Sequence, residues 1–195
     1  MPEALTLGFD TSAAHCAAAL LSGDQLIAGR HEDMSKGQAE RLMPLIEEML
    51  AEAGLGWADL SLIGVGTGPG NFTGIRIAVA AARGLALALN IPAIGIGAAE
   101  ALAFGLPRPC RIIIPAKRDT AIWQDFGDKP GDAQQGPLDS LPPGPPRGIP
   151  LVSIAEGIAR LALARSGSPQ PRPAPIYLRP ADAAPARDRG PVILP

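Results

Sequence analysis

A glycine-rich loop joins a strand-like run to a helical pattern in the stretch Gly64-Val65-Gly66-Thr67-Gly68-Pro69-Gly70-Asn71-Phe72-Thr73-Gly74-Ile75-Arg76. Free backbone N–H groups at the start of such a helix can hold an anion. However, the loop lacks the Lys-Ser/Thr pair of a P-loop, and its glycines do not follow the G-x-G-x-x-G pattern. Two interpretations remain: an anion site, or a tight connection in which glycine permits close backbone approach.

The residues on either side of this stretch predict an α/β lobe with a mixed sheet. Hydrophobic patterns predict strands over residues 5–10, 16–21, 25–28, 61–66 and 93–96, and helices over residues 38–53 and 72–90. The turn at Gly23-Asp24 is short, so the second and third strands are expected to be antiparallel. Pro44 lies inside the first helical pattern and marks either a kink or the true first turn.

Proline divides the chain into two unequal parts. Four of the 22 prolines lie in residues 1–105 and the other 18 in residues 106–195. We therefore predict an N-terminal lobe over residues 1–106, a reduced, Pro-rich second lobe over 107–180 and a flexible tail over 181–195. Strands over 112–114 and 121–123 and a helix over 153–164 are predicted in the second lobe, with a long surface loop over 127–150.

Composition excludes several classes of protein. The 195 residues include 17 Lys+Arg and 19 Asp+Glu, a formal charge of −2, so the chain as a whole is not a strongly basic nucleic-acid binder. Two cysteines and two histidines exclude a disulfide scaffold and a zinc finger. Cys16 lies in an Ala/Leu run typical of a buried position. Cys110 follows Pro109 in a connection, and the sequence does not decide whether it is buried or exposed.

The cytoplasm is the expected location. The first residues are acidic and lead directly into a strand pattern, with no targeting signal. The longest apolar stretch, residues 75–91, is interrupted by Arg76, Arg83 and Asn90, so it is a poor membrane span and no membrane partner is expected.

Few residues could carry chemistry. Asp10-Thr11-Ser12 ends the first strand and could meet a metal-bound water or a phosphate, or could simply satisfy the amides of a turn. His15 and His31 have no metal-binding spacing and no evident triad partners. Arg76 and Arg83 lie seven residues apart on one helix face; they could bind an anionic partner group or be solvated.

Two motifs together resemble the bacterial TsaB (YeaZ) family. The more specific is Gly68-Pro69-Gly70-Asn71-Phe72-Thr73-Gly74-Ile75-Arg76, in which Asn71 stands where the family usually has Ser. The second is Phe9-Asp10-Thr11-Ser12. The runs Gly84-Leu85-Ala86 and Pro175-Ile176-Tyr177-Leu178-Arg179 also fit, so the resemblance covers nearly the whole chain.

Two segments depart from the family's pattern. This chain has Gln38-Ala39-Glu40-Arg41-Leu42 where members often have a His before the first helix. It has Pro115-Ala116-Lys117-Arg118 where members often have Asp-Ala-Arg/Lys, so any role of that Asp is not carried over.

The resemblance implies an α/β fold of the actin-like ATPase type (sugar kinase, heat-shock and actin) with a truncated second lobe. It implies a noncatalytic, activating subunit that pairs with a TsaD-like transferase, the paralogue that threonylcarbamoylates the tRNA adenosine next to the anticodon. A TsaE-like ATPase is a further implied partner, and tRNA is reached through the complex. Alone, the chain is expected to form a homodimer.

The resemblance also implies roles for residues. No catalytic and no metal-binding residue is expected, and this chain requires no cofactor of its own, although ATP and Mg are implied for the assembled complex. A weak or vestigial nucleotide site is expected at Asp10, Thr11, Ser12, Gly68 and Gly70. The first two helices are expected to form the partner interface through Arg41, Leu45, Met49, Ile75, Arg76, Val79 and Arg83. Replacing Val79 or Met49 by Glu should then break the complex and leave the chain folded.

Other interpretations of the residues remain open. The chain could be a minimal actin-like ATPase or phosphotransferase that acts through Asp10 and the Gly68–Gly70 loop. A peptidase has the least support, because no metal-binding histidine pair or convincing triad is present. Direct tRNA contact through Arg172, Arg179, Arg187 and Arg189 is a further possibility.

Overall fold

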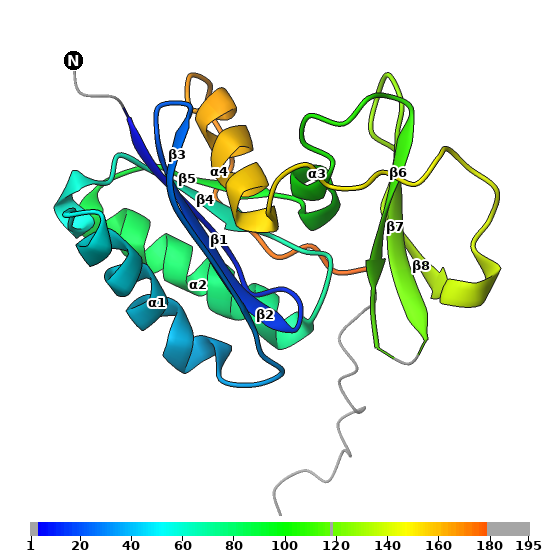
Figure 1. The fold of residues 1–195 in the computed structure, drawn as a ribbon, viewed down its shortest axis with the longest axis horizontal. Coiled ribbons are helices and arrows are strands. Elements are labelled where there is room, and N and C mark those ends of the chain that lie inside the picture. The colour runs from blue at the N-terminus through cyan, green and yellow to red at the C-terminus, as the bar shows by residue number, and fades with distance from the viewer. Residues whose placement is uncertain (1–3, 118, 179–195) are drawn as a thin grey trace, which may run out of the picture.

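A five-stranded mixed sheet with helices on both faces, joined to a smaller three-stranded sheet, forms the fold (Figure 1). The structure is a computed structural model and describes residues 4–117 and 119–178. The order of the larger sheet is β3-β2-β1-β4-β5; β1, β4 and β5 are parallel, and β2 is antiparallel to both β1 and β3. These strands are β1 (Leu5–Asp10), β2 (His15–Ser22), β3 (Gln25–Asp33), β4 (Leu62–Gly66) and β5 (Ala93–Ile96). The predicted α/β lobe with a mixed sheet is confirmed.

Helices cover both faces of this sheet (Figure 1). On one face, α1 (Gln38–Glu52) lies over β2 and β3, and α2 (Phe72–Leu89) lies over β1, β4 and β5. On the other face lie α4 (Ile154–Arg165), packed on β1, β2 and β4, and the short α3 (Ala98–Leu102). Every residue of β1 is buried, because this strand is central and covered on both sides.

The first helix keeps its pattern through Pro44. Its buried side is made of Leu42, Leu45, Ile46, Met49 and Leu50, which repeat at helical spacing and pack in the main core. Pro44 itself is exposed and lies inside α1, so it marks neither the helix start nor the helix end.

The smaller sheet holds more order than its sequence suggests. It consists of β6 (Cys110–Pro115), β7 (Thr120–Phe126) and β8 (Gln134–Pro137) in that order. The predicted loop over 127–150 is therefore partly wrong, since it contains β8 and the 3₁₀ turn Leu138–Ser140. The sequence of β8, Gln-Gln-Gly-Pro, carries no alternating apolar pattern, and pairing with β7 alone makes it a strand.

A buried arginine orders the proline-rich stretch that follows. Arg111 on β6 makes a two-pronged ion pair with Asp125, with Nε to Oδ1 at 2.5 Å and Nη2 to Oδ2 at 2.8 Å. Its Nη1 also donates to the Pro142 carbonyl at 2.6 Å, and Nη2 donates to that of Pro143 at 3.4 Å. Prolines cannot donate backbone hydrogen bonds, so this stretch is held by its carbonyl groups.

Three further features add to or differ from the sequence prediction. The helix α3 was not predicted, because its five residues are too few to show a periodic pattern. Cys110, whose exposure the sequence left open, is buried, since it opens β6 and packs with Phe126 against α3. The two sheets lie on either side of residue 106, but the helix α4, from the second part of the chain, returns to pack on the larger sheet. The predicted tail, residues 181–195, lies outside the described residues.

Two glycines allow α4 to approach the sheet closely. Gly8 on β1 and Gly64 on β4 are register partners, and both lie directly beneath α4. A Cβ added at Gly8 would lie 2.4 Å from the Ala155 carbonyl oxygen, and one at Gly64 would lie 2.9 Å from that of Ile158. Because both contacts are with helix backbone, α4 would have to move away from the sheet to admit a side chain.

We predict that Gly8→Ala destabilises the chain by about 1–3 kcal/mol, the usual cost of overpacking a core. The matched control is Gly29→Ala on the edge strand β3, where an added Cβ meets nothing within 4 Å. That change should be neutral or slightly stabilising, because alanine restricts the unfolded chain. Urea denaturation of both variants measures the difference; equal midpoints would contradict the close packing of α4.

Candidate functional site

A buried turn at the end of β1 concentrates the polar side chains of the molecule. Asp10 is 0% exposed, and its Oδ1 accepts three hydrogen bonds. The donors are the Ser12 amide at 2.9 Å, the Ser12 hydroxyl at 2.8 Å and His15 Nε2 at 2.7 Å. Thr11 donates its hydroxyl to the Gly74 carbonyl at 2.7 Å, which ties the turn to the first turn of α2. Asp10 therefore accepts a hydrogen bond from an amide of the turn, as one of the two interpretations of the sequence predicts.

The glycines of the loop between β4 and α2 allow the loop to lie directly against this turn. A Cβ at Gly66 would lie 1.8 Å from Asp10 Oδ2, one at Gly70 would lie 2.3 Å from the Ser12 carbonyl oxygen, and one at Gly74 would lie 1.8 Å from that of Thr11. The Asn71 amide also donates to the Ser12 carbonyl, at 2.6 Å. The loop and the turn are thus packed backbone to backbone, and glycine is required for their close approach.

Strand pairing brings the two histidines together, which their separation in sequence did not reveal. His15 on β2 and His31 on β3 have ring centroids 4.9 Å apart. The Ser12 hydroxyl donates to Asp10 rather than to His15, so these residues do not form the nucleophile–base pair of a hydrolase. Among residues 4–117 and 119–178, no three His, Cys, Asp or Glu side chains form a group suited to a metal ion.

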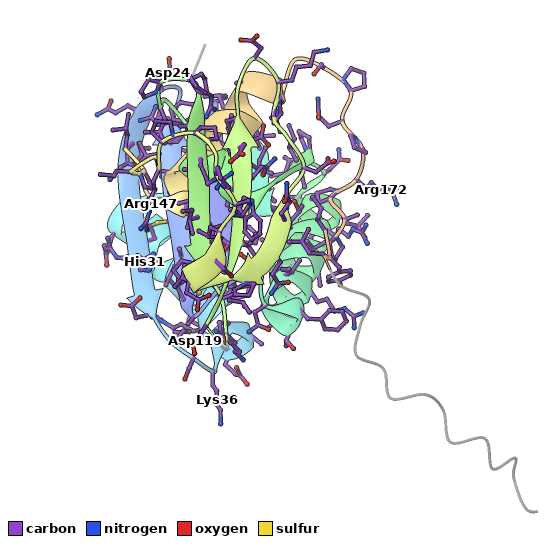
Figure 2. The ribbon with its side chains drawn as sticks, turned by 90° about the vertical axis from the view of Figure 1, so that its right-hand side faces the viewer. Asp24, His31, Lys36, Asp119, Arg147 and Arg172 are labelled. Carbon is purple, nitrogen blue, oxygen red and sulfur yellow. The ribbon has the colours of Figure 1, made fainter. Side chains whose placement is uncertain are left out.

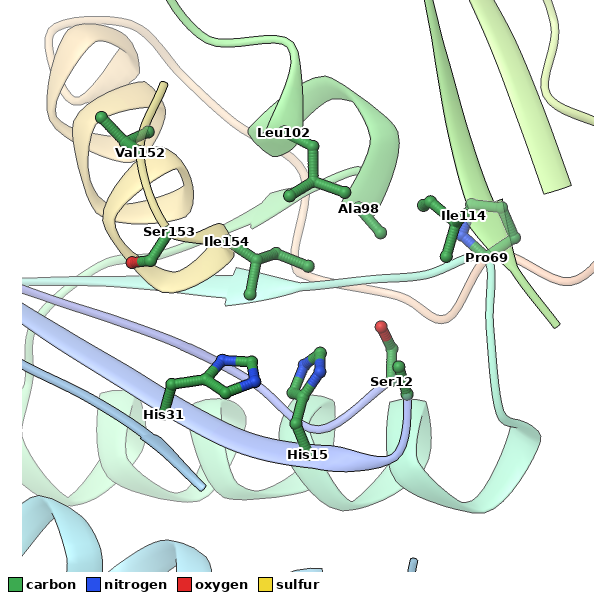
Figure 3. Close-up of a pocket in the computed structure, with 11 residues that line it drawn as sticks. Ser12, His15, His31, Pro69, Ala98, Leu102, Ile114, Val152, Ser153 and Ile154 are labelled. Atoms are coloured by element: carbon green, nitrogen blue, oxygen red, sulfur yellow. The ribbon is translucent and has the colours of Figure 1, made fainter. Parts of the chain in front are cut away.

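A small cavity opens beside these histidines, between the two sheets (Figure 3). Its volume is about 280 Å³. Ser12, His15 and His31 lie on one side, and side chains of α3, α4 and β6 lie opposite. The remaining lining is mainly apolar: Ala13, Pro69, Ala98, Leu102, Ile114, Val152 and Ile154, with Ser153. Ligand pockets typically measure about 300–1,000 Å³, so this cavity lies below the usual range.

The residues of the predicted nucleotide site make contacts within the chain itself. Asp10 Oδ2 is aimed at the Gly66 backbone and not at the cavity, and it has no hydrogen-bond partner among the described residues. The Thr67 and Asn71 amides are already engaged by backbone carbonyls. Gly68 and Gly70 abut Ile75 and Ser12 respectively, so neither position has room for a side chain.

An extended segment near the end of the described chain closes over the same loop. The Ile176 amide donates to the Thr67 carbonyl at 2.8 Å, and Pro173 lies against Gly95 on β5. Tyr177 then reaches α2, where its hydroxyl accepts from Arg76 Nε at 3.0 Å. We call residues 173–177 the C-terminal strap. The C-terminal strap is thus ordered against the first lobe.

Four residues predicted to meet a partner are instead part of the chain's own core. Leu45, Met49 and Ile75 are fully buried and Val79 is 3% exposed. All four point from α1 or α2 toward the sheet. The sequence left open whether these residues face a partner or the sheet; they face the sheet, because the apolar side of each helix is needed to cover it. For the same reason Val79→Glu or Met49→Glu would bury a charge and unfold the chain, contrary to the expectation that the fold would survive.

The three arginines predicted at the interface lie on the surface. Arg41 on α1 is bound to Glu32 and Glu48, with Nη2 to Glu32 Oε1 and Nη1 to Glu48 Oε1 both at 2.7 Å. Hydrogen bonds from this guanidinium lower the pKa of both carboxyl groups. Arg76 and Arg83 are exposed on α2. Neither forms an ion pair with a carboxylate within the described ranges.

The outer side of α2 carries small and apolar residues that no described part of the chain covers. We call Ala80, Gly84, Leu87 and Ala88 the outer stripe; all four are exposed, and Leu87 is 85% exposed. A Cβ at Gly84 would meet nothing within 4 Å. By length and composition alone α2 could cross a membrane. In this fold it connects β4 to β5 and lies along the sheet, with 28% of its residues buried. The outer stripe is therefore an exposed apolar face on a domain helix.

Of the four arginines considered for direct tRNA contact, Arg172 alone lies within the described residues. Figure 2 shows Arg172 at one edge of the molecule and Arg147 well apart from it, over the smaller sheet. Arg179, Arg187 and Arg189 lie outside the described residues. Cys16 is buried, and burial raises the pKa of its thiol to about 11, which makes it unreactive.

Comparison with known families is decisive at this point. A sequence model of the family described as TsaD, tRNA N6-adenosine threonylcarbamoyltransferase, matches residues 31–129, just over half of the chain. The chain belongs to the TsaD family. The match includes both α1 and α2, the loop before α2 and the first two strands of the smaller sheet. No curated protein matches the chain in sequence.

Solved structures agree with this assignment. YeaZ from Pseudomonas aeruginosa is 25% identical, with a TM-score of 0.73 over 90% of this chain and 100% of that chain. A second structure, of an uncharacterized protein with similarity to peptidase YeaZ from Pseudomonas aeruginosa, is 24% identical, with a TM-score of 0.74 over the same shares. The resemblance to TsaB (YeaZ) and the actin-like ATPase fold are both confirmed.

We predict that the isolated chain binds ATP·Mg only negligibly. A ligand that binds the folded state at 100 times its Kd stabilises it by about 2.7 kcal/mol, so binding would be visible as a thermal shift. With about 5 mM ATP·Mg the melting temperature should match that with Mg alone. A clear rise that is lost in Asp10→Ala would contradict the sealed geometry and restore the ATPase interpretation.

Proposed function

We propose that this chain is a noncatalytic subunit that docks on a TsaD-like transferase and supports threonylcarbamoylation of tRNA. Membership in the TsaD family and the YeaZ-like fold support work in this tRNA modification. The one observation that carries the docking role is the outer stripe of α2, an apolar helix face that residues 4–117 and 119–178 leave uncovered. Monomeric domains rarely expose such faces unless they bind another macromolecule.

The geometry near Asp10 supports a noncatalytic role. The turn and the glycine loop pack directly against each other. The Asp10 carboxylate accepts hydrogen bonds from Ser12 and His15. We therefore propose that this chain needs no cofactor, and that ATP and Mg are used elsewhere in the complex, by the transferase and a TsaE-like ATPase. tRNA would reach the chain only through the complex, in the cytoplasm.

The docking surface differs from the one predicted by sequence. In place of the buried Leu45, Met49, Ile75 and Val79, the contacts would come from the outer stripe, with Arg76 and Arg83 at its side. Burying a side chain the size of Leu87 is worth about 1.5–3 kcal/mol before entropy costs. Without the transferase, a second copy of the chain could cover the same stripe, which is the basis for a proposed homodimer.

We predict that Leu87→Arg prevents complex formation with the TsaD-like paralogue of the same cell. The change removes an apolar contact and places a charge in the interface, so affinity should fall about 100-fold or more, at 1.4 kcal/mol for each factor of ten. Size-exclusion chromatography with light scattering, applied to the chain alone and to the mixture, measures the complex directly.

The matched control is Ile149→Arg, since Ile149 is 80% exposed but lies before α4, away from the outer stripe. This variant should bind as the unaltered chain does. Both variants should melt like the unaltered chain, because neither side chain is buried. Equal binding by Leu87→Arg would refute the docking surface; two separate peaks for the unaltered chain would refute the partner role.

A further inference from the structure

Two carboxylates on the exposed side of α1 form no ion pair within the described residues. This helix contains four glutamates: Glu40, Glu47, Glu48 and Glu52. Glu48 is held by Arg41 and Glu52 by Arg30, and both of these pairs lie toward β3. Glu40 has no ion-pair partner in the described chain, and Glu47 meets only Trp57 Nε1, at 3.4 Å. Glu40 and Glu47 are seven residues apart, so they lie on one side of the helix, two turns or about 10.5 Å apart.

The two guanidinium groups of α2 lie beside the outer stripe, on the side away from α1. The whole of α2 contains no Asp or Glu, and its two cations, Arg76 and Arg83, are also seven residues apart. Arg76 is fixed in place: its Cζ lies 3.8 Å from the centroid of the Phe72 ring, and its Nε donates to Tyr177. Its two terminal nitrogens form no hydrogen bond with the described residues, so they can donate a bidentate pair of hydrogen bonds to a carboxylate.

The two charged rows flank the outer stripe of α2 on different sides. Ile77 on α2 shares a hollow with Glu40 of α1, so the row of α2 that contains Ile77 and Gly84 faces α1. Arg76 contacts the C-terminal strap, which runs beside β5, so Arg76 and Arg83 face away from α1. Across the surface the order is therefore carboxylates, small apolar residues, guanidinium groups.

We propose that this order sets which partner docks: the partner presents basic side chains opposite α1 and carboxylates opposite α2, on either side of an apolar centre. This inference rests on the proposed function and names the chemistry of the partner's face. Opposed charges across an interface accelerate encounter and fix orientation, whereas like charges exclude wrong partners. The C-terminal strap gains a role here, because Tyr177 holds Arg76 in the position from which it meets the partner.

Charge-reversal variants of the full chain test the proposal by surface plasmon resonance against the TsaD-like paralogue. The two docking variants are Arg76→Glu with Arg83→Glu, and Glu40→Lys with Glu47→Lys. Each should lower the association rate constant about 10-fold or more at about 50 mM salt, and the loss should shrink at about 500 mM, where exposed charges are screened. Leu87→Arg should instead act mainly by raising the dissociation rate.

Controls carry the same change in net charge on exposed residues of the smaller sheet and its loops. Lys129→Glu with Arg147→Glu matches the first variant, and Asp128→Lys with Asp132→Lys matches the second. An association rate that falls equally in variants and controls overturns the charge order and leaves the docking surface intact. The charge order is likewise overturned, with the docking surface intact, if Leu87→Arg weakens binding while neither docking variant changes the association rate. No binding by the unaltered chain overturns both proposals.

Discussion

The backbone contact between the Asp10–Ser12 turn and the glycine loop before α2 is the constraint on which the molecule depends. Gly66, Gly70 and Gly74 admit the turn only because they have no side chain. The contact ends β1, orients β4 and fixes where α2 begins. It also places Thr11 against the first turn of α2 and Asp10 beneath His15. Glycines that in other α/β proteins surround a phosphate here surround part of the chain itself.

This constraint gives the molecule two faces of different character. On the inside, the polar turn is sealed, and the remaining cavity is small and mostly apolar. On the outside, α2 is held along the sheet with its small residues uncovered and its cations in one row. In this actin-like fold the chain's own turn packs against the glycine loop, and α1 and α2 lie together on one face of the sheet. A helix pair of fixed geometry is suited to binding a second protein.

The sequence predicted the larger sheet well, because its strands and helices show the periodicities that burial imposes. Leu42, Leu45, Ile46 and Met49 revealed α1 by their spacing, but spacing alone could not say whether that side meets the sheet or a partner. Charge was the missing signal, since the exposed side of α1 is marked by Glu40 and Glu47. β8 and α3 had no pattern to read, and His15 met His31 only through strand pairing.

The central claim is that a protein partner covers the outer stripe of α2. Hydroxyl-radical footprinting of the chain, alone and mixed with its TsaD-like paralogue, tests this most directly. Leu87 and Ile149 are 85% and 80% exposed, so each side chain should be oxidised readily in the chain alone. In the mixture, oxidation of Leu87 should fall sharply while that of Ile149 stays the same. Undiminished oxidation of Leu87 under conditions where the two proteins elute together would contradict the account.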